Sequence, residues 1–167
     1  AQDYLKRRLE EMGVQPILQP FSYKAGEGES AEVRRGCNIG GLILAPGKNK
    51  TFVVIGVEDS APGAAVLLEA GRLLQKKKDE LKGGLVMLFF EGRGLGGPAW
   101  FTKYPFVPLS KVKAMLSLDG IGGPPGGRKL FFVGRSVHPL LAEKGRRLLA
   151  EAGLAEGEEN KEGEKTD

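Results

Sequence analysis

Two uninterrupted apolar segments limit the folds available to this chain more than any other feature of its sequence. Thr51–Val57 and Leu85–Phe90 contain no charged residue and are rich in β-branched or aromatic side chains. A strand with one face in water alternates apolar and polar residues, whereas a strand covered on both faces reads as a continuous apolar run. These segments therefore predict a largely parallel sheet with helices on both of its faces.

The segments around these two runs complete an alternation of strands and helices. Further strands are predicted at residues 14–23, 37–44, 112–118 and 129–133, and helices at 1–12, after Ser60, around 99–104 and at 138–152. This order is typical of an α/β fold, a three-layer sandwich with a mixed but mostly parallel sheet. Pro16 and Pro20 cannot donate to a ladder, so the first strand is expected at a sheet edge.

We expect one domain over residues 1–154, followed by a disordered acidic tail. A chain of 167 residues is long enough for one domain with a sizeable core. The tail, Ala155–Asp167, holds six acidic and two basic residues and has few apolar side chains to offset the entropy of ordering.

The composition argues against nucleic-acid and membrane partners. The formal net charge is +4, but the basic residues are scattered over predicted helix surfaces and are not interleaved with aromatic residues that could stack on bases. No apolar run reaches the roughly 18–20 residues that span a bilayer, and the N-terminus reads as a helix rather than a signal peptide. We expect a soluble protein. The single Cys37, which cannot form an internal disulfide, gives a weak preference for the cytoplasm.

Several sequence blocks, in one order, connect the chain with a known family. They read YLKRRLEEMGVQPILQPFSY, CNIGGLILAPGKNKTFVVIGVEDS, PGAAVLLEAGRLL, GLVMLFFEGRGLGGPAWFTKY and VKAMLSLDGIGG. Over roughly residues 1–150 the chain resembles the co-catalytic zinc aminopeptidase family, which includes bacterial leucyl aminopeptidases and glutaminyl cyclases. The resemblance implies that family's three-layer fold, shortened at loops and at the C-terminal end. It also implies a peptide substrate if the chain is active.

The same resemblance implies a two-zinc site, and the sequence departs from it at several ligands. Two zinc ions would polarise a carbonyl group and lower the pKa of a bridging water. Val57 stands where the family has its first His, and Gly92 stands where a Glu ligand belongs. The family carries its bridging Asp in a loop between Pro-Gly-Ala and the next helix, but here Gly63-Ala64-Ala65 runs straight on and that loop is missing; the family's last His would fall beyond residue 167.

Four acidic residues remain near the expected site. By resemblance Glu91 matches the general base, Asp119 the Asp of the second metal, and Asp59 the supporting Asp; Glu58 is the neighbour of Asp59. At the carboxyl ends of adjacent strands, these acids would bind a hard cation weakly. Catalytic zinc normally needs three protein ligands, so we expect no cofactor, or zinc if the family site survives.

The missing ligands favour a non-catalytic domain, degenerate or engineered, that serves as a scaffold or binding module. The alternative is a metal-dependent aminopeptidase that retains residual activity, with Glu91 as its base. The shortened C-terminal part is also expected to leave an exposed sheet edge, and an unpaired edge favours self-association.

A second alternative is nucleotide binding through a Gly-rich turn. Residues 92–97 read G-x-G-x-x-G directly after an apolar strand, and Asp119 ends the next strand. This is the outline of a dinucleotide-binding turn. Pro105 and Pro108 would interrupt the helix that such a turn requires, and the glycines also match the Gly-Leu-Leu-Gly turn of the peptidase family, so this alternative is the least favoured.

Overall fold

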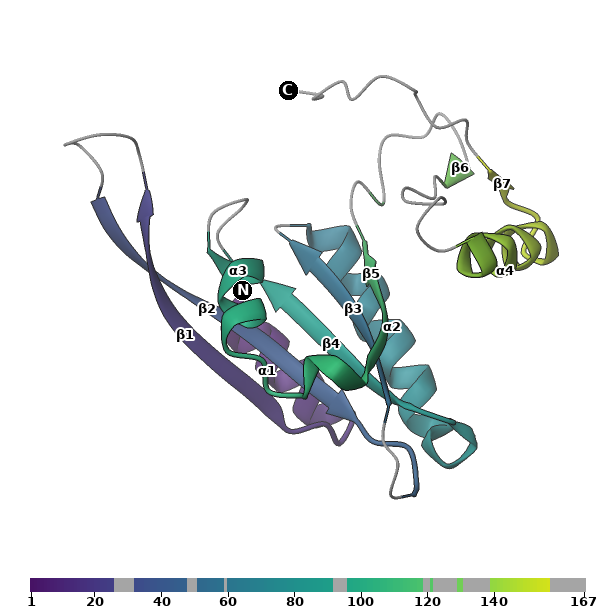
Figure 1. Ribbon diagram of the computed structural model, residues 1–167, viewed down its shortest axis with the longest axis horizontal. Coiled ribbons are helices and arrows are strands. Elements are labelled where there is room, and N and C mark those ends of the chain that lie inside the picture. Colours follow the sequence, from purple (N-terminus) through teal and green to yellow (C-terminus); the bar gives the residue numbers. More distant parts are fainter. Residues whose placement is uncertain are drawn as a thin grey trace. The chain divides into compact units, whose positions relative to one another are not determined.

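The computed structural model describes residues 1–25, 32–47, 51–58, 60–91, 96–118, 121, 129–130 and 139–156 (Figure 1). The chain divides into two compact units, Ala1–Gly122 and Gly123–Asp167. Within the described ranges no helix combines the length and the apolar character that a membrane crossing requires.

The first unit contains a five-stranded sheet. Its elements are α1 (Gln2–Glu11), β1 (Pro16–Ala25), β2 (Glu32–Ile43), β3 (Phe52–Glu58), α2 (Ala61–Lys76), β4 (Gly84–Phe90), α3 (Gly97–Lys103) and β5 (Val112–Ser117), with short 3-10 turns at Lys78–Glu80 and Leu109–Lys111. The strand order is β1-β2-β4-β3-β5. β1 and β2, and β2 and β4, are antiparallel, whereas β3 is parallel to both β4 and β5. The predicted α/β fold with a mixed sheet is confirmed.

The two faces of this sheet are covered by different helices (Figure 1). On one face α1 and α2 bury Leu9 and Leu67 against Ile39, Met87 and other apolar residues of the strands. On the opposite face the core consists of Phe52, Val54, Val86, Leu88, Phe90, Phe101 and Val107, of which Phe101 belongs to α3. Alternate residues of β4 enter the two cores, so all seven residues of this strand are buried. This double burial explains the continuous apolar runs in the sequence.

The second unit contains a short parallel pair and one helix. β6 (Lys129–Leu130) pairs with β7 (Ala155–Glu156), and α4 (Pro139–Glu151) buries Ala142 and Leu149. Residues 157–167, most of the predicted disordered tail, lie outside the described residues, as do residues 131–133 of the predicted fourth strand. The single domain over residues 1–154 stays a prediction.

β1 lies at a sheet edge, as its two prolines predict, and the edge ribbon is longer than expected. β2 begins at Glu32 rather than near Cys37, and its first residues pair with β1 only, because the pairing with β4 covers Ile39–Ile43. The residues Glu32–Arg35 are exposed and mostly charged, so they give no apolar signal of a strand. At the other edge, β5 pairs within the described residues with β3 alone, and self-association there stays a prediction.

A buried amide joins three elements at the α3 end of the sheet. Asn38 of β2 is 0% exposed. Its Nδ2 donates to the carbonyl oxygen of Gly97 at 2.7 Å and to Gln19 Oε1 at 3.4 Å, and its Oδ1 accepts the backbone N–H of Glu91 at 3.4 Å. Gln19 in turn donates to the carbonyl oxygen of Tyr104 at 2.7 Å. The two amide side chains thereby attach both ends of α3 to the sheet.

Replacing Asn38 with leucine is therefore expected to destabilise the first unit. The Asn38→Leu substitution conserves most of the volume but removes every hydrogen bond of the amide, so the free energy of unfolding should fall by about 2 kcal/mol. The change in the free energy of unfolding is measured by urea denaturation monitored by circular dichroism. Thr102→Val on α3 removes an exposed hydrogen bond to the Pro98 carbonyl and is the control, with a change within about 0.5 kcal/mol. Equal effects of the two substitutions would show that Asn38 is not a structural link.

Candidate functional site

The candidate site lies at the carboxyl ends of β3 and β4. Glu58 is the last residue of β3 and Glu91 directly follows β4. Parallel neighbouring strands end at the same edge of a sheet, and open α/β sheets bind ligands there. The other two acids of the predicted cluster, Asp59 and Asp119, lie outside the described residues.

The carboxylate of Glu91 is held by hydrogen bonds from two elements. The backbone N–H of Cys37 donates to Glu91 Oε2 at 2.6 Å, and Gln2 Nε2 of α1 donates to the same oxygen at 2.9 Å. The backbone pairing of β2 with β4 ends at Ile39 and Phe89. The N–H of Cys37 lies beyond this pairing and donates to the Glu91 side chain instead of to a backbone carbonyl group. Its carboxylate therefore continues the ladder and ties α1 to the sheet.

Glu58 and Glu91 do not share a face of the sheet. Glu58 is opposite Phe90 in the β3–β4 ladder. Side chains of paired residues in neighbouring strands lie on the same face of the sheet, so Glu58 is assigned to the face that α3 covers, as is Phe90. Glu91 is bonded to Gln2 of α1, which covers the opposite face. Among the described residues, no group of three or more His, Cys, Asp or Glu side chains is placed to hold a metal ion. A cluster that includes Asp59 and Asp119 stays a prediction.

The position of the missing first His is filled by apolar packing. Val57 is 3% exposed and belongs to the core beneath α2. A Cβ at Gly63 would come within 2.7 Å of Val57 Cγ2 and 3.1 Å of the Leu118 carbonyl oxygen, so α2 approaches the strand too closely for any side chain at Gly63. Ser60 caps the helix, because its Oγ accepts the Gly63 N–H at 3.1 Å. α2 already includes Gly63, Ala64 and Ala65, so the chain is helical where the resemblance places the ligand-bearing loop.

The described part of the Gly-rich turn is explained by packing. Gly97, the first residue of α3, lies so close to the chain that a Cβ would come within 2.5 Å of the Glu91 carbonyl oxygen and 2.6 Å of Asn38 Oδ1. The glycine is thus required by the contact between α3 and the end of β4. Gly92 and Gly94, the other glycines of the motif, lie outside the described residues, and α3 has only seven residues.

The pKa of the Cys37 thiol depends in part on the neighbouring Glu91 carboxylate. Burial raises the pKa of this thiol above its usual range, and the Glu91 carboxylate raises it further, while a backbone hydrogen bond from Gln19 and the Lys6 ammonium act in the opposite direction. A raised pKa leaves little thiolate at neutral pH, so Cys37 is a weak nucleophile here.

The contacts of Glu91 were missed by the sequence analysis. Glu91 contacts Gln2 across 89 residues and Cys37 across 54. No periodicity or local motif relates positions so far apart; a covarying pair in an alignment is the signal that could reveal them.

Comparison with known proteins places these features in a family. Residues 41–166 match the model of Peptidase family M28. No curated protein matches the chain.

Solved structures of similar fold include a protein assigned as a zinc exopeptidase and several glutaminyl cyclases. A Bacteroides vulgatus protein assigned as a zinc-dependent exopeptidase has a TM-score of 0.72 at 22% identity, and the glutaminyl cyclase of Porphyromonas gingivalis has 0.69 at 20%; both matches cover 91% of this chain and 62% of the other. LapB from Legionella pneumophila has 0.63 at 20% identity, over 93% of this chain and 46% of its own. The chain thus spans about 62% of the first two relatives. The predicted resemblance and its three-layer fold are confirmed.

The contact between Glu91 and Cys37 can be tested by thiol alkylation. Because the negative charge of Glu91 raises the Cys37 pKa, Glu91→Gln should lower it and increase the thiolate fraction. Iodoacetamide should then react roughly twofold faster at mildly alkaline pH, with the midpoint of the pH–rate profile shifted down. Glu58→Gln, which neutralises the carboxylate assigned to the opposite face, is the matched control and should leave the rate unchanged. If neither substitution changes the rate, the Glu91 carboxylate does not lie beside Cys37.

Proposed function

Because the chain belongs to peptidase family M28, we propose that it is a non-catalytic member of that family, a scaffold or binding module that keeps the fold without the two-zinc chemistry. The observation that carries this proposal is the packing of Val57 against Gly63. Gly63 of α2 lies directly against Val57, the position that the resemblance assigns to a metal ligand.

The packing at Val57 supports the proposal energetically. A histidine in place of Val57 would bring a polar ring into an apolar core beneath α2, and a buried polar group without a partner costs free energy. The close approach of Gly63 leaves the ring no space on the helix side. The surroundings of residue 57 therefore fit a valine side chain and would not accommodate a histidine.

The hydrogen bonds of Glu91 support the proposal as well. A general base must be within reach of the proton that it accepts. One oxygen of Glu91 instead accepts from both Cys37 and Gln2, a role within the fold that explains the glutamate without catalysis.

The residues described do not fit the zinc centre that the family implies. Glu91 is bonded into the fold, Val57 has no donor atom, and Glu58 is assigned to the other face of the sheet. Catalytic zinc takes three protein ligands in one tetrahedral arrangement, and these positions do not offer one.

A metal-dependent hydrolase is the second candidate. The presence of Glu58 and Glu91 at the carboxyl ends of neighbouring strands favours it, because ligands bind at this edge in open α/β sheets. In that case Glu91 would accept a proton from water, with Asp59 and Asp119 completing a cation site.

A peptidase assay separates the two candidates. The chain is incubated with zinc and an aminoacyl p-nitroanilide, and separately with an N-terminal glutaminyl peptide, because glutaminyl cyclases are among its structural relatives. We expect product formation no faster than with zinc alone. Glu91→Gln should give the same background, since an amide oxygen can still accept the Cys37 N–H and the fold is retained. Zinc-dependent turnover that is lost in Glu91→Gln would refute the non-catalytic role and establish the hydrolase.

A further inference from the structure

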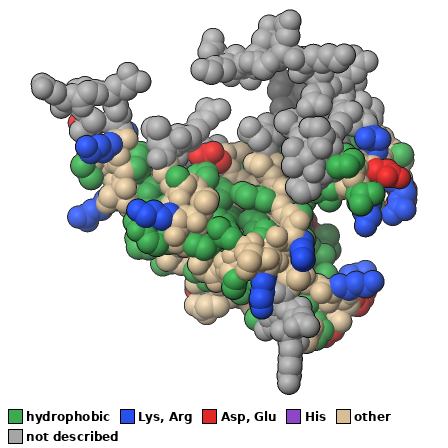
Figure 2. Space-filling model, in the orientation of Figure 1, with side chains coloured by type: hydrophobic (Ala, Val, Ile, Leu, Met, Phe, Trp, Pro, Cys, Tyr) green, Lys and Arg blue, Asp and Glu red, His purple; other side chains and the backbone are tan. Residues whose placement is uncertain are grey.

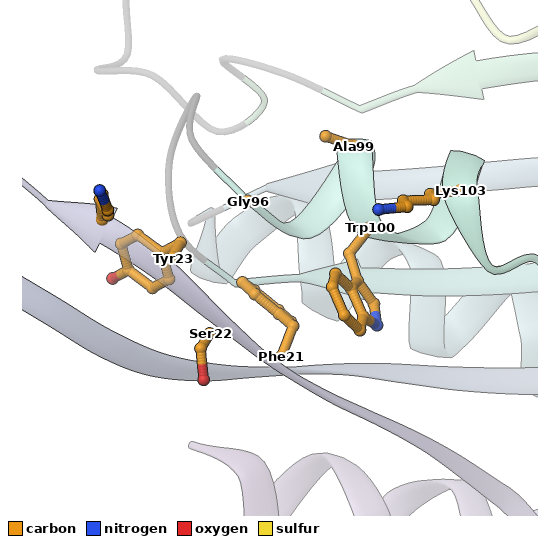
Figure 3. Close-up of a pocket in the computed structure, with 8 residues that line it drawn as sticks. Phe21, Ser22, Tyr23, Gly96, Ala99, Trp100 and Lys103 are labelled. Atoms are coloured by element: carbon orange, nitrogen blue, oxygen red, sulfur yellow. The ribbon is translucent and has the colours of Figure 1, made fainter.

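A hollow of about 400 Å³ lies where the outer end of β1 meets α3 (Figure 3). Its lining comes from residues 21–24, from Gly96 and from one side of α3. None of the residues that hold Glu91 or pack on Val57 lines it, so the hollow is separate from the candidate site.

Aromatic rings form one side of this hollow. Tyr23, Phe21 and Trp100 follow one another in Figure 3, with ring centroids 5.8 Å apart for the first pair and 6.2 Å for the second. Tyr104 extends the series, 4.5 Å from Trp100. Phe21 lies against Gly96, where a Cβ would come within 2.5 Å of the ring. Phe21 is only 5% exposed, so the surface open to an apolar or aromatic group of a ligand comes from the half-buried rings of Tyr23 and Trp100 on either side of it.

Two lysines add positive charge to the same hollow. Lys24 extends from the end of β1 and Lys103 from α3, and both line the hollow and are exposed. Within the described residues neither is paired with a carboxylate; the Lys103 ammonium lies 5.2 Å from the centre of the Tyr104 ring. Figure 2 likewise shows basic side chains around the apolar surface of this face. The charge is complementary to an acidic ligand.

The hollow follows the free edge of β1. Successive residues of a strand point to opposite faces, yet Ser22 and Lys24 line the hollow together with Phe21 and Tyr23, so it must include the edge of the strand. In the part of the chain that the structure describes, β1 pairs with β2 only. Residues 21–24, beyond Pro20, pair with β2 on one side, so alternate residues among them direct their N–H and carbonyl groups to the free edge. An extended peptide can add to such an edge as a further strand.

We propose that this hollow binds an extended acidic peptide segment of a partner protein that carries an aromatic side chain. The peptide adds to the edge of β1, its ring packs against Tyr23 and Trp100, and its carboxylates lie near Lys24 and Lys103. This inference rests on the binding role proposed above, to which it gives a place and a ligand class, but it uses no residue of the candidate metal site.

The single tryptophan of the chain allows a direct titration, because Trp100 lines the hollow. The probe is a peptide blocked at both ends, with two phenylalanines flanked by glutamates. We expect a saturable change of tryptophan fluorescence that weakens when salt is raised. A peptide with serines in place of the phenylalanines, and one with lysines in place of the glutamates, should each bind more weakly.

A pair of double variants locates the binding site. Lys24→Gln with Lys103→Gln should weaken binding roughly fivefold, as expected for two exposed ion pairs. Lys82→Gln with Lys113→Gln removes the same charge from exposed lysines that do not line the hollow and should leave the affinity unchanged.

Three results would overturn the proposal: no saturable response, equal weakening by the two double variants, or tighter binding of single-stranded oligothymidylate than of the peptide. The last would assign the hollow to nucleic acid instead. Zinc-dependent hydrolysis in the peptidase assay would refute the non-catalytic role without changing the titration, so the two proposals fail separately.

Discussion

The buried Asn38 amide is the interaction on which the arrangement at the carboxyl end of β4 depends. Its donors hold Gly97 at the start of α3 and Gln19 of β1, and its oxygen accepts the N–H of Glu91 at the end of β4. A fully buried amide is costly unless its groups are paired, and here each polar atom has a partner. The amide fixes where α3 begins, where β4 ends and how β1 lies beside them. It thus joins β1 and α3, which line the hollow, to the end of β4, which Glu91 follows.

At this edge the fold of a metallopeptidase family is combined with side chains that stabilise the fold itself. Val57 packs under α2 in contact with Gly63, and Glu91 accepts hydrogen bonds from Cys37 and Gln2. Each of these contacts stabilises the scaffold, and each involves a position that the family resemblance assigns to a metal ligand, a ligand-bearing loop or a catalytic base. The packing of Val57 and the hydrogen bonds of Glu91 are both consistent with the proposed non-catalytic role, since each gives the residue a structural function.

The sequence predicts the strands of this fold well where both faces are buried. β3 and β4 give continuous apolar runs because alternate residues enter two different cores, and the prolines of β1 identify an edge strand. The exposed start of β2 could not be predicted, since Glu32–Arg35 pair through their backbone and carry no apolar pattern. The partners of Glu91 could not be predicted either, because its role is set by contacts with α1 and β2 that only the folded chain creates. Family resemblance located the glutamate, whereas only the structure shows what its carboxylate bonds to.

Zinc content separates a structural role of this edge from a catalytic one most directly. The chain is purified in excess zinc, desalted, and its zinc per chain determined by elemental analysis. If Val57 and Glu91 serve packing and pairing as described, the value should be close to zero, because the remaining acids do not supply the ligands that zinc requires. A value near one or two zinc ions per chain would contradict this, and would mean that ligands at this edge assemble a metal centre after all.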